Sequence, residues 1–167
     1  MKGFPVAVGR DHIPSLLEKS LSSKDYSIKS IEPLAVPVYI IVTDVSIKRA
    51  FGLKPRQFER RYVVDGITEE VFRIVEKPEY EEYCVQNVRE LPARLSESRA
   101  AEMAEKLTHK NVARSFKFFW YPEIAIRSVE KTCLLVWLVG LQGPDGAEST
   151  VWVNSFSGMV KTPAPVR

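Results

Sequence analysis

The feature that most constrains the fold is a repeated order of elements, because the pattern of the first half of the chain recurs in the second. Each half opens with apolar side chains at helical spacing and continues with short segments rich in β-branched and aromatic residues. The sequence therefore predicts an α+β fold of two similar units, residues 1–90 and residues 91–167. Each unit is expected to hold one helix packed on a curved antiparallel β-meander of cystatin-like type.

In the first half, Asp11 is predicted to cap a helix with Pro14 in its first turn, where the missing N–H of proline costs no hydrogen bond. The residues that share the apolar face of this helix are Ile13, Leu16, Leu17 and Leu21. Predicted strands follow at residues 26–31, 36–42, 62–64 and 68–75. Residues 48–58 are ambiguous between a loop and a short helix, and residues 76–83 form an acidic linker or a short helix.

In the second half, Ser96 or Ser98 is predicted to cap a helix whose apolar face holds Ala100, Met103, Ala104 and Leu107. Predicted strands follow at residues 113–120, 124–129, 132–141, 151–153 and 159–161. Residues 143–146, Gly-Pro-Asp-Gly, predict a hairpin turn. Residues 36–42 and 133–141 are expected to be inner strands, and residues 162–167 a mobile tail.

Both halves end in a similar turn. Residues 64–71 and 153–160 align so that Asp65 and Asn154 lead the turn and a valine resumes the strand. Asp and Asn suit this position because their short side chains accept hydrogen bonds from the backbone two residues ahead. The match favours a structural duplication, while a single sheet with unrelated ends stays open as the alternative.

The second half resembles PepSY-type domains. Residues 95–104 resemble the opening helix of that family, and residues 151–160 are similar to its closing hairpin, with a fainter echo over residues 11–75. The sequence departs from the family pattern where Asn154 and Ser155 replace Asp-Ala and where Glu69 replaces the turn glycine. The resemblance implies a binding or inhibitory role, as in propeptides of thermolysin-like metalloproteases and in bacterial envelope proteins, with no chemistry of its own.

No pattern of catalytic or metal-ligating residues is present. Neither His12 nor His109 has Cys, His, Asp or Glu at metal-ligand spacing, so no metal and no cofactor are expected. The glycines are scattered and form no phosphate-binding loop. Cys84 and Cys133 are predicted to be buried thiols, although a disulfide between them stays open.

Two conspicuous runs are the candidate binding residues. The first is basic and includes Arg56, Arg60 and Arg61; it indicates a solvated or salt-bridged face or an acidic protein partner, and nucleic acid is not expected because the net charge is only +3. The second is aromatic and includes Phe116, Phe118, Trp120 and Tyr121. On a strand, these aromatic side chains cover both faces, which indicates core packing or a contact surface for a partner.

The sequence favours a non-enzymatic protein- or peptide-binding regulatory module that uses a free sheet face or an edge strand, with a second copy of the chain as one candidate partner. The alternative is a small-ligand carrier or an enzyme with a pocket of cystatin-like or nuclear-transport-factor-2-like shape, in which Asp44, Glu123 and Tyr121 would converge. No membrane span and no signal peptide are seen. We therefore expect a cytoplasmic chain, or a cell-envelope chain if a targeting segment was removed.

Overall fold

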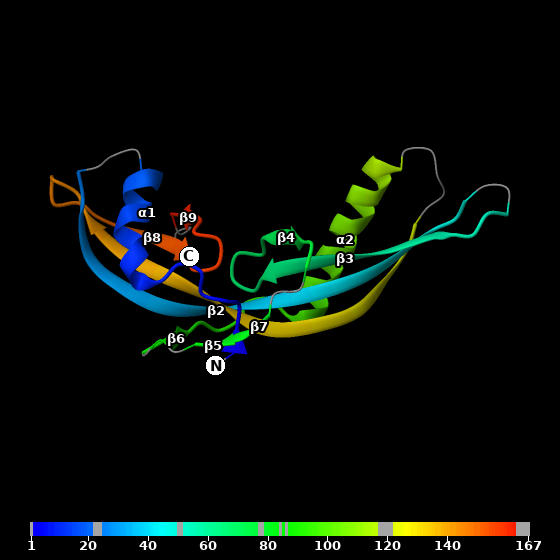
Figure 1. Cartoon of the computed structure of the whole chain (residues 1–167), viewed down its shortest axis with the longest axis horizontal. Coiled ribbons are helices and arrows are strands. Elements are labelled where there is room, and N and C mark those ends of the chain that lie inside the picture. Colours follow the sequence, from blue (N-terminus) through cyan, green and yellow to red (C-terminus); the bar gives the residue numbers. More distant parts are fainter. Residues whose placement is uncertain are drawn as a thin grey trace. The chain divides into compact units, whose positions relative to one another are not determined.

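The computed structural model describes residues 2–21, 25–49, 52–76, 79–83, 85, 87–116 and 122–162 (Figure 1). The helical elements are η1 (Arg10–His12), α1 (Ile13–Ser20) and α2 (Glu97–Ser115). The strands are β1 (Lys2–Gly3), β2 (Ser27–Ile47), β3 (Arg56–Asp65), β4 (Val71–Ile74), β5 (Glu81–Glu82), β6 (Arg89–Glu90), β7 (Glu123–Gln142), β8 (Glu148–Asn154) and β9 (Val160–Lys161). Neither α-helix is both long enough and apolar enough to cross a bilayer.

In the described part of the chain the strands form one mixed sheet of nine strands, so the predicted fold of two helix-plus-meander units is wrong. The main order is β4-β3-β2-β7-β1-β5, with β6 beside β2 and with β8 between β7 and β9. Among the described strands, β1 pairs with β7 and β6 pairs with β2 in parallel, and a meander contains no parallel pair. The expectation that residues 36–42 and 133–141 lie on inner strands is confirmed, because β2 and β7 have neighbours on both sides.

The prediction failed because it divided both long strands. β2 runs without a break through Pro33 and Pro37, although proline lacks the N–H that a ladder needs and usually marks a strand end. β7 likewise joins the predicted strands at 124–129 and 132–141. The predicted strand at 113–120 is also wrong at its start, since α2 continues to Ser115; residues 117–120 lie outside the described residues.

The chain divides into two compact units whose segments alternate along the sequence. Met1–Val36, Pro78–Leu91 and Cys133–Arg167 form one unit, here called the α1 unit. Pro37–Lys77 and Pro92–Thr132 form the other, the α2 unit. Each unit therefore draws on both of the predicted halves, 1–90 and 91–167, and β2 and β7 each supply residues to both units.

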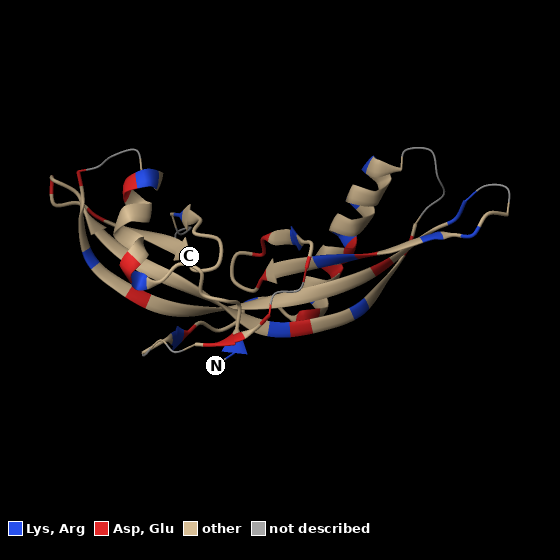
Figure 2. Ribbon diagram, in the orientation of Figure 1, with Lys and Arg blue, Asp and Glu red and all other residues tan. Residues whose placement is uncertain are grey.

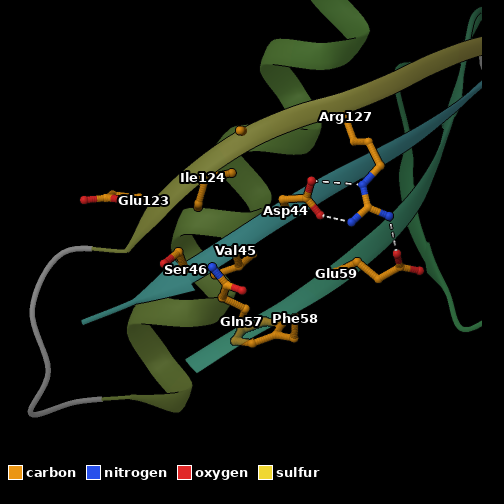
Figure 3. A pocket seen from close by; sticks show the side chains of 10 residues that line it. Asp44, Val45, Ser46, Gln57, Phe58, Glu59, Glu123, Ile124 and Arg127 are labelled. Atoms are coloured by element: carbon orange, nitrogen blue, oxygen red, sulfur yellow. Dashed lines mark hydrogen bonds and ion pairs between the residues drawn. The ribbon is translucent and has the colours of Figure 1, made fainter. Parts of the chain in front are cut away.

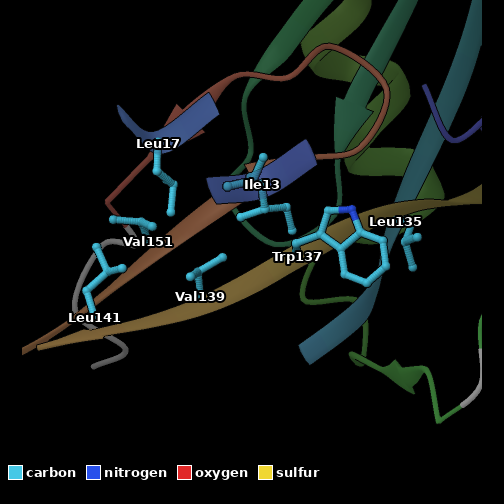
Figure 4. Close-up of a cluster of buried hydrophobic side chains, with 8 residues drawn as sticks. Ile13, Leu17, Leu135, Trp137, Val139, Leu141 and Val151 are labelled. Carbon is cyan, nitrogen blue, oxygen red and sulfur yellow. The ribbon is translucent and has the colours of Figure 1, made fainter. Parts of the chain in front are cut away.

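In the α1 unit, the predicted apolar face of α1 packs on β7 and β8 (Figure 4). Ile13 and Leu17 are fully buried, as are Leu135 and Val139 of β7 in the same cluster. The Trp137 indole Nε1 donates a hydrogen bond of 2.8 Å to the Val8 carbonyl oxygen, which lies just before the helix. This bond satisfies the polar atom of a buried indole while its ring fills the core.

In the α2 unit, Ser96 caps α2 as predicted, its side chain accepting from the Arg99 N–H. The buried side chains of α2 recur at every fourth position and are small: Ala100, Ala104, Thr108 and Val112. They pack on the residues of β2 and β3 that face the helix, among them Tyr39 and Tyr62. The Tyr39 hydroxyl donates a hydrogen bond of 2.6 Å to the Leu95 carbonyl oxygen, just before α2. Trp137 makes the equivalent bond just before α1.

The two predicted turns have the same geometry. The Asp65 Oδ1 accepts from the N–H groups of Ile67 and Thr68 at 2.7 and 2.9 Å. The Asn154 Oδ1 accepts from the N–H groups two and three residues ahead at 2.9 and 3.0 Å. The fifth turn position is left-handed in both, at Glu69 with φ of 59° and at Gly158 with φ of 71°. The predicted role of Asp65 and Asn154 is confirmed, while a duplication of the chain stays a prediction.

Asp65→Ala and Asn154→Ala are each expected to lower the free energy of unfolding by about 1–2 kcal/mol, because each leaves two turn N–H groups without their acceptor. Asp65→Asn keeps the acceptor oxygen and serves as the control, with a change below about 0.5 kcal/mol. Urea unfolding followed by circular dichroism measures all three. Alanine variants as stable as the wild type would contradict the role given to these side chains.

Candidate functional site

The basic and aromatic candidates meet where α2 ends beside β3. Phe116 directly follows α2, and its ring stacks on that of Phe58 with centroids 6.1 Å apart and an interplanar angle of 29°. The Arg56 guanidinium carbon lies 5.1 Å from the Phe116 ring centroid, and that of Arg60 lies 4.6 Å from the Phe58 centroid. We call Arg56, Phe58, Arg60 and Phe116 the Arg–Phe row.

Strand alternation places this row on the helix side of the sheet. Phe58 is opposite Val45 and Tyr62 is opposite Ile41, and both β2 partners pack on α2. Even-numbered residues of β3 therefore face the helix. Arg73 of β4 is opposite Tyr62 and faces the same way, so it adds a third arginine beside the Arg–Phe row.

The Arg–Phe row carries positive charge that no acidic side chain of the described residues pairs with. Burial of Arg60, followed by the neighbouring charges of Arg73 and Arg56, lowers the pKa of Arg60. Within the part of the chain that the structure describes, neither the two arginines of this row nor the neighbouring Arg73 forms an ion pair with an acidic side chain. A site with several guanidinium groups and no internal counter-charge attracts carboxylates or phosphates.

The other candidate residues are placed elsewhere or not described. Arg61 faces the opposite side of the sheet, where it pairs with Glu59 and where its Nη1 lies 3.5 Å from the Val75 carbonyl oxygen. It is separated from Arg56 and Arg60 because an odd-numbered residue of β3 points away from the helix. Phe118, Trp120 and Tyr121 lie outside the described residues, as does Cys84, the partner in the disulfide left open above.

A hollow of about 530 Å³ is lined by residues of β2, β3 and β7 (Figure 3). Arg127 lies between two carboxylates. Its Nε donates a hydrogen bond of 2.9 Å to Asp44 Oδ2, and its Nη2 also pairs with Asp44. Its Nη1 donates a hydrogen bond of 2.7 Å to Glu59 Oε2. The hydrogen bonding of Arg127 to Asp44, followed by the negative charge of Asp44, raises the pKa of Arg127. One guanidinium thus joins β7 to both β2 and β3.

Asp44 and Glu123, two of the groups expected to converge in a pocket, both line this hollow, and each is paired with a basic side chain. Asp44 and Glu59 both bind Arg127, and Glu123 lies 3.0 Å from Lys48 Nζ with each side chain about two-thirds exposed. Each of these three carboxylates therefore has a cationic neighbour, Arg127 or Lys48. Among the described residues, no group of three His, Cys, Asp or Glu side chains could hold a metal ion.

The backbone edge of β3 is the feature that the sequence did not reveal. β4 pairs only with the part of β3 from Arg61 to Val64, so residues 56–60 have no strand on their outer side among the described residues. The Asp65 N–H donates outward to Glu70, so the odd-numbered residues of β3 turn their backbone groups away from β2. Gln57 and Glu59 therefore present N–H and C=O groups that no described strand uses; we call residues 56–60 the β3 edge.

The signal for this site was the alternation of arginine and phenylalanine at positions 56, 58 and 60, which has the period of a strand. The strand at residues 56–60 was missed because Gly52 and Pro55 favoured a loop or a short helix over residues 48–58.

Comparisons with protein-family models, with curated proteins and with solved structures found no match to this chain. The PepSY resemblance therefore stays a prediction, and the function has to be argued from the site.

Arg127→Gln is expected to lower the thermal midpoint, because it leaves Asp44 and Glu59 opposite each other on adjacent strands with less counter-charge. The loss should be larger at low ionic strength than in about 0.5 M NaCl, which screens the repulsion. Arg99→Gln breaks a pair on the surface of α2 and should change the midpoint little. A loss for Arg127→Gln that is independent of salt would contradict the electrostatic account.

Proposed function

We propose that this chain is a non-enzymatic binding module that takes up an extended segment of a partner protein as an additional strand on the β3 edge. The proposal rests on the backbone groups of Gln57 and Glu59, which no described strand pairs with, in a strand whose other side is fully paired to β2. Strand addition uses such groups for affinity, and the side chains on either face supply specificity.

The end of β4 supports an added strand in this position. β4 stops at Ile74, and the chain bends away at residues 75–76, so the line of β4 is not continued beside the β3 edge. The Arg61 side chain lies beside the end of β4, where it contacts the Val75 carbonyl oxygen. A segment of about five residues spans roughly 17 Å, which is the length of the β3 edge.

The charges at the edge favour a partner other than a second copy of this chain. If two copies paired antiparallel through their β3 edges, centred on Phe58, Arg56 of one would lie opposite Arg60 of the other. Like charges directly opposite each other destabilise a strand pair, and natural edges use charged side chains in this way against self-association. The proposed occupant is therefore a peptide segment of different charge.

Gln57→Pro removes the outward N–H of residue 57 and leaves the hydrogen bonds to β2 in place, since the neighbouring even-numbered residues make them. The probes are fluorescein-labelled seven-residue peptides in which Val and Thr alternate or in which Glu or Lys replaces selected residues. We expect fluorescence anisotropy to detect binding of at least one of them, weakened about tenfold or more by Gln57→Pro.

The matched control is Gln57→Thr, which keeps the N–H and suits a strand, and should bind within about twofold of the wild type. Circular dichroism and the thermal midpoint check that each variant is folded. The proposal is wrong if no peptide of the panel binds the wild type, or if folded Gln57→Pro binds as the wild type does.

A further inference from the structure

We infer that the segment taken up by the β3 edge is acidic, with two carboxylate side chains on one face of the added strand and an apolar side chain between them. This inference rests on the proposed function and names the chemistry of its partner. The sequence pattern is acid, any residue, apolar, any residue, acid, because side chains on one face of a strand recur at every second position.

The register follows from the Arg–Phe row. A strand paired to the β3 edge places alternate side chains beside Arg56, Phe58 and Arg60, on the face of the sheet that also carries α2. Two carboxylates four residues apart would then lie beside the two arginines. The residue midway between them would lie on the stacked rings of Phe58 and Phe116.

The stacking prepares the arginines for this role. Each guanidinium lies over an aromatic ring, Arg56 over Phe116 and Arg60 over Phe58, so one face of the group is used by the ring. The N–H groups of a guanidinium lie in its plane, and in a stacked group they remain able to donate to a carboxylate. Stacking also restricts the side chain before binding, which lowers the entropy cost of holding it in place.

The charge around the row favours an anion. Arg60 is half-buried and has Arg56 and Arg73 as electrostatic neighbours, which together lower its pKa and disfavour its charged form. A carboxylate beside Arg60 would relieve this repulsion. Figure 2 shows Lys and Arg gathered on the hairpin that joins β2 and β3, so the wider field around the β3 edge has the same sign.

The side chains on the opposite face of the β3 edge disfavour acidic residues of the added strand on that face. Gln57 and Glu59 point to that face, and Glu59 is shared between Arg61 and Arg127. An acidic side chain of the added strand on this face would lie beside the Glu59 carboxylate and be repelled. The two residues that separate the acids from the apolar residue should therefore be neutral or basic.

The experiment compares two peptides of identical composition. In Thr-Glu-Thr-Val-Thr-Glu-Thr both Glu side chains share a face with Val, whereas in Thr-Thr-Glu-Val-Glu-Thr-Thr they lie on the other face. We expect the wild type to bind the first about tenfold more tightly than the second and than the Glu-free peptide, with an affinity that falls as NaCl is added.

The double variant Arg56→Gln/Arg60→Gln should lose about tenfold in affinity for the first peptide and most of the salt dependence. Arg56→Lys/Arg60→Lys keeps the charge and should lose less, which separates an effect on binding from an effect on folding. The matched control is Arg10→Gln/Arg89→Gln, which removes two exposed arginines of the α1 unit and should leave affinity unchanged.

The outcomes separate this inference from the proposed function. The Glu-free or the Lys-containing peptide could bind as tightly as the first peptide, with Gln57→Pro still abolishing this binding. In that case strand addition stands and the acidic partner is overturned. Equal affinity for the two composition-matched peptides overturns the proposed register. If no peptide binds, the proposed function fails together with the inference.

Discussion

Each helix of this protein depends on a strand that lies far from it in the sequence. α1 packs on β7 and β8, and α2 packs on β2 and β3. A helix of eight residues such as α1 is not stable alone in water, so its stability comes from burying Ile13 and Leu17 on that distant sheet. The hydrogen bonds of Trp137 and Tyr39 to the carbonyls that precede each helix fix where the helix begins on its strand.

The β3 edge belongs to the part of β3 that lies beside the end of α2. Nineteen helical residues span roughly 28 Å, and the β2 segment beneath them, from Tyr39 to Ile47, has about the same length. β3 pairs with β2 along this whole stretch and so supports the last turn of the helix, where Val112 packs on Val45 and Ile47. β4 has only four residues and borders the other end of β3.

The sequence indicated local features well, because they depend on a few adjacent residues. The apolar faces of both helices, the Ser96 cap, the turn at 143–146 and the turns led by Asp65 and Asn154 are of this kind. Periodicity tells which side of a strand is buried but not which strand lies beside it. The continuity of β2 through its prolines and the pairing of distant segments were therefore missed, and the β3 edge, whose accessibility depends on where β4 ends, was missed with them.

Amide hydrogen exchange at the β3 edge, measured by NMR with and without the peptide Thr-Glu-Thr-Val-Thr-Glu-Thr, shows directly whether the peptide adds to the sheet as a strand. We expect fast exchange at Gln57 and Glu59 in the protein alone, and slowing by about tenfold or more when the peptide is bound. The amides of Phe58 and Arg60 should exchange slowly in both states, because they face β2. Peptide binding that slows exchange elsewhere and leaves Gln57 and Glu59 unchanged would contradict the account.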